Sequence, residues 1–102
     1  MSAHSDVQNS FAFGPLTFTT SGLGVFCMSD RLRERIEALP ADELRKANRE
    51  AWRQLRPMVR VAKRESNASR YGWNDQRDFA INVCESVCKA TWRALARIGG
   101  AA

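Results

Sequence analysis

Eight basic side chains between residues 45 and 64 recur mostly at spacings of three or four and share one side of a predicted helix. At about 100° per residue, they fall within an arc of roughly 100°. Guanidinium groups form paired hydrogen bonds with phosphate, and Glu50 and Glu65 lie off this side, so the pattern indicates an anionic partner. We call this set the basic row: Arg45, Lys46, Arg49, Arg53, Arg56, Arg60, Lys63 and Arg64.

Trp52 is predicted at the edge of the basic row, with Arg49 and Arg56 as its neighbours on the helix surface. A ring between arginines would stack on a base, which favours nucleic-acid or nucleotide phosphates as the anion. The alternative is a solvated helix face with Trp52 half-buried against the core. The lack of neutralising acids on the row favours the anionic partner.

A predicted loop at residues 66–74 carries Arg70, Tyr71 and Trp73. Arg70 extends the candidate anion-binding set beyond the helix. Exposed aromatic residues on a loop are candidates for a recognition surface. The position of this loop between two helices favours the alternative, in which both rings fold over the core as a lid.

Cysteine and histidine usage argues against catalysis and metal binding. Cys27, Cys84 and Cys88 are an odd number without a secretory signal, so they are not a disulfide framework. Cys84 and Cys88 lie one helical turn apart, but a metal would need further ligands, and His4 is the only histidine. We therefore expect buried thiols that behave as small hydrophobic groups, with no enzymatic activity, metal or cofactor.

The element that positions the basic row is a long helix predicted from about residue 40 to 66. Pro57 inside it predicts a kink and not a break, because the apolar and basic sides stay in phase across the proline. A short helix that begins after Ser29 or Asp30 precedes it and runs to about Leu39.

The last predicted helix runs from Asn74 or Asp75 to about Ile98. Its apolar arc spans roughly 220°, wider than a helix lying on a single neighbour requires. This helix is therefore central, or it has apolar surface left for a second chain. We expect a homodimer or a larger oligomer through it.

The N-terminal segment differs from the rest of the chain. Residues 1–10 are polar and without period, which predicts a flexible tail. Residues 11–28 are rich in Phe, Thr and Gly, and their alternation predicts a β-hairpin at about 15–27 with a tight turn at Ser21-Gly22. An extended arm that docks on another subunit fits the same residues.

The bulk composition is that of one folded domain, which we place at residues 11–102. The chain has 102 residues, of which 44% are hydrophobic and 26% charged, and this excludes wholesale disorder. Residues 45–70 hold nine basic and two acidic residues, a charge of +7; since the whole chain carries +5, the remainder is −2. No apolar run is long enough to span a membrane, so a cytoplasmic protein is expected.

These patterns predict a mainly α fold: a helical hairpin or three-helix domain with an N-terminal β-hairpin or extended arm packed on it. Residues 32–39, 44–62 and 79–98 are expected to supply the core. The stretch ALPADELRKANREAWRQLRPMVRVAK, about a quarter of the chain, resembles in composition the long helix of small phage neck and tail-completion proteins. The strands that follow that helix in those proteins are missing here, so the resemblance assigns no residue roles.

The sequence is compatible with three functions. The first is a non-catalytic module that binds nucleic-acid or nucleotide phosphates through the basic row. The second is a protein-interaction module, such as a phage-type or mobile-element inhibitor (anti-CRISPR-like), that docks on an acidic surface of a host protein or nucleoprotein complex. The third is a structural subunit of a larger assembly.

Overall fold

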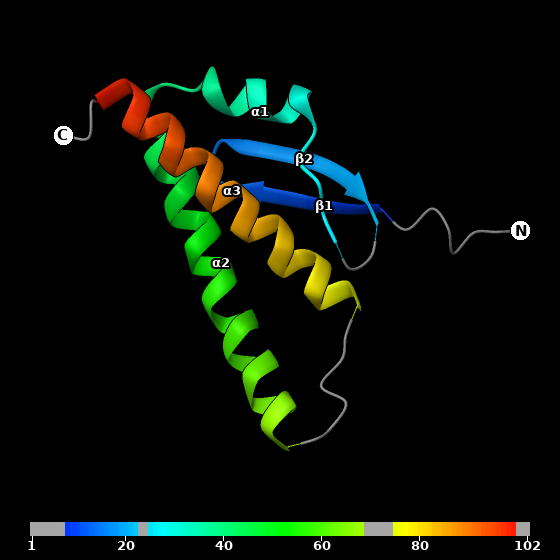
Figure 1. The fold of residues 1–102 in the computed structure, drawn as a ribbon. Coiled ribbons are helices and arrows are strands. Elements are labelled where there is room, and N and C mark those ends of the chain that lie inside the picture. Colours follow the sequence, from blue (N-terminus) through cyan, green and yellow to red (C-terminus); the bar gives the residue numbers. More distant parts are fainter. Residues whose placement is uncertain (1–7, 23–24, 69–74, 100–102) are drawn as a thin grey trace, which may run out of the picture.

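The computed structural model describes residues 8–22, 25–68 and 75–99 of the chain. Its elements, in chain order, are β1 (Gln8–Phe13), β2 (Leu16–Ser21), α1 (Asp30–Glu37), α2 (Ala41–Ala68) and α3 (Asp75–Gly99). Figure 1 shows the long helices α2 and α3 with the hairpin and the short helix α1 beside them. The fold is mainly helical with an N-terminal hairpin packed on the helices, which confirms the predicted fold class.

The hairpin turns at Gly14 and Pro15. β1 and β2 pair antiparallel, with Phe13 opposite Leu16, so the turn has two residues. Gly14 has a φ of 62°, and Pro15 cannot adopt a positive φ. A type II′ turn fits this pair, since it needs positive φ only at its first central residue, where glycine is favoured.

Two predictions about the N-terminal segment are therefore wrong. The hairpin does not occupy residues 15–27, because Ser21 ends β2 and its partner strand precedes it in the chain. Residues 8–10 do not belong to a flexible tail, because β1 begins at Gln8. The segment also packs on its own helices as a hairpin and does not extend as an arm.

An aromatic cluster explains why residues 8–13, and not the residues after Ser21, pair with β2. The chain has five phenylalanines, and all of them meet in this cluster. Phe11 stacks across the strands on Phe18 at a centroid distance of 5.6 Å, and Phe26 meets Phe79 of α3 edge-on at 5.7 Å. A turn at Ser21-Gly22 would leave Phe11 without a strand partner, so burial of apolar surface selects the earlier turn.

The interface between α2 and α3 forms the larger part of the core. Both helices agree with their predicted bounds, and α2 remains one helix through Pro57. The fully buried Ala47 and Ala51 of α2 allow the two backbones to approach. Buried side chains come from all three regions predicted to supply the core, and Phe13 and Leu16 of the hairpin add to them.

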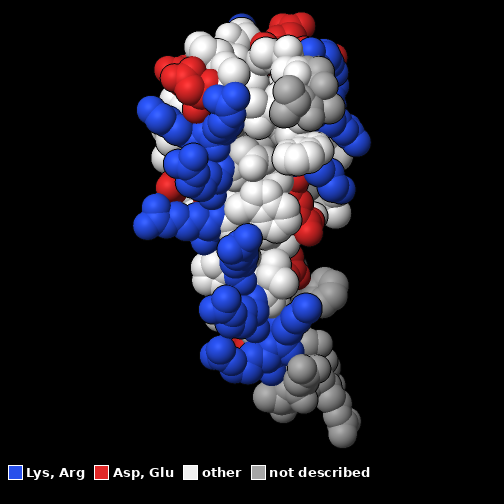
Figure 2. Space-filling view, turned by 90° about the vertical axis from the view of Figure 1, so that its left-hand side faces the viewer, with Lys and Arg blue, Asp and Glu red and all other residues white. Residues whose placement is uncertain are grey.

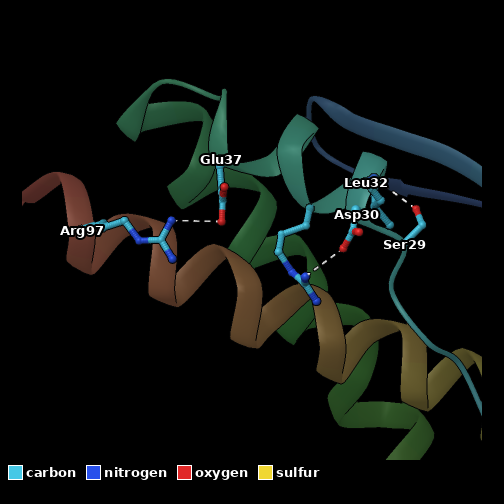
Figure 3. Close-up of polar contacts among 6 residues, drawn as sticks. Ser29, Asp30, Leu32, Glu37 and Arg97 are labelled. Carbon is cyan, nitrogen blue, oxygen red and sulfur yellow. Dashed lines mark hydrogen bonds and ion pairs between the residues drawn. The ribbon is translucent and has the colours of Figure 1, made fainter.

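The short helix α1 is held at its beginning and at its end (Figure 3). The Ser29 hydroxyl accepts a hydrogen bond from the Leu32 amide at 3.2 Å, which confirms Ser29 as the N-cap. Glu37 accepts a hydrogen bond from the guanidinium of Arg97 in α3 at 3.0 Å. With Leu32 and Ile36 buried, these contacts place α1 against α3 and leave the basic side of α2 uncovered.

Candidate functional site

All eight side chains of the basic row are exposed on α2. The buried residues of α2, from Leu44 to Leu55, lie on the other side of the helix, as the apolar period predicts. Figure 2 shows Lys and Arg side chains in a column along the molecule, with uncharged atoms beside them. The structure therefore brings the basic row together on one surface.

The acids of α2 do not neutralise this surface. Glu50 forms an ion pair with Arg53 at 3.1 Å, between groups that are partly or largely exposed, so solvent screens it. Glu65 pairs with Arg77 of α3 and so points away from the row. Within the described residues, the other seven cations of the basic row have no carboxylate within ion-pair distance.

Trp52 lies half out of the core. Its side chain is 45% exposed, and the guanidinium carbon of Arg56 lies 5.8 Å from the ring centroid. This distance is within the range of a cation–π contact. Trp52 therefore presents ring surface to solvent beside a cation, and whether a base stacks on it stays a prediction.

A groove between α2 and α3 borders the basic row and consists of two hollows that share Trp52 and Arg56. The first hollow has a volume of about 550 Å³. Its lining combines apolar side chains with cations and one carboxylate: Trp52, Leu55, Arg56, Val59, Arg60, Lys63, Glu85, Cys88 and Lys89.

The second hollow, about 1040 Å³, lies nearer the beginning of α2. One wall carries Arg45, Arg49 and Arg53 of the basic row, and the other carries Trp92 and Ile98 of α3. Trp92 is 68% and Ile98 55% exposed, so this wall presents apolar surface to solvent. Trp92 was not among the residues predicted for the site. Its signal in the sequence is the over-wide apolar arc of the last helix.

A polar bridge fixes the two walls of the groove. The side-chain amide of Asn48 in α2 donates to the Thr91 hydroxyl at 2.9 Å and to the Cys88 carbonyl at 3.1 Å. Thr91 is fully buried, and its hydroxyl donates to the Val87 carbonyl at 2.7 Å. Because Asn48 lies one turn before Trp52 and Thr91 adjoins Trp92, this bridge joins the two helices close to both rings.

The cysteines contribute no reactive group to the groove. Burial raises the pKa of the Cys84 thiol to about 12, with smaller contributions from Cys88 and Glu85. Burial also raises the pKa of Cys88 to about 11, with Glu85 adding to the effect. Both thiols therefore stay protonated at neutral pH, whereas Cys27 is exposed.

Some predictions cannot be placed on this surface. Arg70, Tyr71 and Trp73 lie outside the described residues, so the proposed recognition loop and its alternative as a lid stay predictions. Among the residues that the structure describes, no three His, Cys, Asp or Glu side chains gather as a metal site, and no helix is long and apolar enough to cross a bilayer. Association of copies through α3 likewise stays a prediction.

Comparisons with protein families, with curated proteins and with solved structures found no match to this chain.

Proposed function

We propose that this protein binds the phosphate backbone of a nucleic acid through the basic row. The observation that carries the proposal is the set of seven exposed cations on one side of α2 that have no carboxylate partner among the described residues. A solvated helix face that only confers solubility mixes charges of both signs. A surface of one sign instead attracts a polyanion and releases its counterions on binding.

The dimensions of the row suit an extended polyanion. From Arg45 to Arg64 the helix rises about 28 Å at 1.5 Å per residue. Along the axis of a duplex each strand rises about 3.4 Å per phosphate, so the row is as long as about eight base pairs. The side chains of the row carry donors and no acceptors, which suits phosphate oxygens along its whole length, so recognition directed mainly at the backbone is expected.

Salt dependence of binding tests this proposal. Fluorescence anisotropy with labelled oligonucleotides is measured from about 50 to about 200 mM salt. If about five cations contact phosphates, log K should fall with log salt with a slope of about −3.5 for a single strand or about −4.5 for a duplex. A flat salt response would contradict the proposal.

A charge-reversal pair locates the binding surface. The variant R49E/R60E reverses two cations of the row that have no ion-pair partner among the described residues, and it should weaken binding more than tenfold. The control R31E/R93E makes the same change of net charge at exposed positions on α1 and α3. Equal losses in both variants would show that net charge, and not the row, governs binding.

A second candidate is docking on an acidic protein surface, as a phage-type inhibitor of a host protein or nucleoprotein complex would do. The exposure of Trp92 and Ile98 beside arginines favours it, because Trp and Arg are the residues that most often anchor protein interfaces. Recovery of one stoichiometric protein partner, unchanged by nuclease treatment, would support this candidate over the first.

A further inference from the structure

We infer that the α2–α3 groove accepts the unpaired bases of a single-stranded nucleic acid while its phosphates lie on the basic row. This inference rests on the proposed function and specifies its ligand. The observation behind it is the wall of the groove on the α3 side, whose residues do not belong to the basic row.

Two exposed tryptophans from different helices line one hollow. Trp52 belongs to α2 and Trp92 to α3, and both border the hollow of about 1040 Å³. They are 45% and 68% exposed, so each offers ring surface that the protein itself leaves uncovered. Bases stack on such rings whatever their identity, because every base has a π face.

The phosphate contacts and the stacking surface are adjacent. Arg45, Arg49 and Arg53 border the same hollow from the α2 side. A strand whose phosphates follow these cations would have the α3 wall within reach of its bases. This arrangement of a cationic track beside aromatic rings is the one that single-strand binding requires.

A duplex would use only half of this surface. Its bases are stacked on each other and paired, so they cannot reach Trp92 or the apolar floor of the groove. A duplex would contact the cations and leave the rings in water. The groove therefore favours a strand with free bases over a paired one.

A second copy of the chain fits the groove poorly. The described lining of both hollows contains one carboxylate, Glu85, against six cations of the basic row and Lys89. A symmetric partner would bring the same excess of cations to the same place, and like charges in an interface oppose association. A polyanion neutralises this charge, which is why we assign the groove to a single strand.

The test compares a labelled oligo(dT) of about 12 nucleotides, longer than the row, with a duplex of equal length. The wild-type protein should bind the single strand more tightly. The variant W92A should weaken single-strand binding about 5- to 150-fold, the effect expected for loss of one stacked base, and should leave duplex binding unchanged. W92F should keep most of the single-strand affinity because it keeps a ring.

Controls separate stacking from misfolding. Trp92 is largely exposed, so W92A should melt as the wild type does when followed by circular dichroism. The variant V25A removes another exposed apolar side chain, 78% exposed and outside the groove, and should bind oligo(dT) like the wild type. Oligo(U) and oligo(dU) strands run in parallel differ only in the sugar and identify the preferred one, and tight binding of either strand supports the inference.

The outcomes distinguish this inference from the proposed function. Equal affinity for strand and duplex, with W92A changing neither, would overturn the inference and leave backbone binding standing. Absence of any salt-dependent binding to either ligand would overturn both. A dimer that dissociates on W92A substitution would show that a second copy fills the groove, and the inference would again fail.

Discussion

Replacing Asn48 by alanine and Thr91 by valine, singly and together, should reveal a coupling free energy of about 1 kcal/mol between these side chains. The hydrogen bond of 2.9 Å between them joins α2 to α3. The bond is partly buried, so water replaces it only in part when one partner is removed. The coupling free energy therefore measures how much this hydrogen bond stabilises the contact between α2 and α3.

The expected size of each effect follows from the hydrogen bonds. T91V keeps the shape of the side chain but leaves one amide hydrogen of Asn48 without its acceptor, at a cost of about 1 to 2 kcal/mol. N48A loses two hydrogen bonds, offset in part by a gain of about 0.5 kcal/mol from the helix propensity of alanine. The shared bond is lost only once in the double variant, so its destabilisation should be smaller than the sum of the singles.

Urea denaturation of the four proteins, followed by circular dichroism, gives the coupling free energy. An exposed pair in the hairpin, Ser10 and Thr19, whose hydroxyl oxygens are 3.4 Å apart, provides a matched control cycle. That control should give a coupling near zero, because both groups are hydrated in the unfolded and the folded protein. If the Asn48 and Thr91 changes add within about 0.3 kcal/mol, the bridge does not stabilise the crossing and this reasoning is wrong.

Four further predictions concern the hairpin and the thiols. F13A should cost about 3 to 5 kcal/mol of unfolding free energy because Phe13 is fully buried, whereas T19A at the exposed Thr19 should cost less than about 0.5 kcal/mol, both measured by urea denaturation. G14A should cost about 1 kcal/mol or more because Gly14 has a positive φ, and a thermal melt of G14N, which tolerates that φ better, should show a smaller loss. Folding raises the pKa of the Cys84 thiol from 9.0 to about 12, so the protonated thiol contributes to the free energy of unfolding. This contribution is complete below pH 9.0 and is lost as the pH rises toward about 12. The variant C84A should therefore lose less stability than the wild type over that pH range. In the native protein at pH 8, a thiol reagent should modify Cys27 quickly and Cys84 only through unfolding, and equal rates for the two would refute the assigned burial.

The helices and the basic row could be predicted because their signals are local. Apolar and basic side chains repeat at the helical period, and the N-cap at Ser29 lies next to the helix that it begins. Such patterns depend on neighbours within one or two turns. The structure confirms these elements and the exposure of every member of the row.

The turn of the hairpin could not be chosen from local sequence. Gly14-Pro15 and Ser21-Gly22 both contain residues that favour turns. The choice depends on Phe79, more than 50 residues further along the chain, against which the ring of Phe11 lies. A contact at that sequence separation leaves no local pattern, so alternation alone assigned β2 to the wrong partner.

The sequence by itself determined that α2 has one cationic and one apolar side, because helical geometry converts spacing directly into direction. Only the tertiary structure decided what lies beside the cations. The crossing of α2 and α3 pairs Glu65 with Arg77 and brings Trp92 to the groove that holds Trp52. These residues belong to different helices, and their contacts depend on how the buried faces of the two helices pack together. The residue spacing within one helix does not determine that packing.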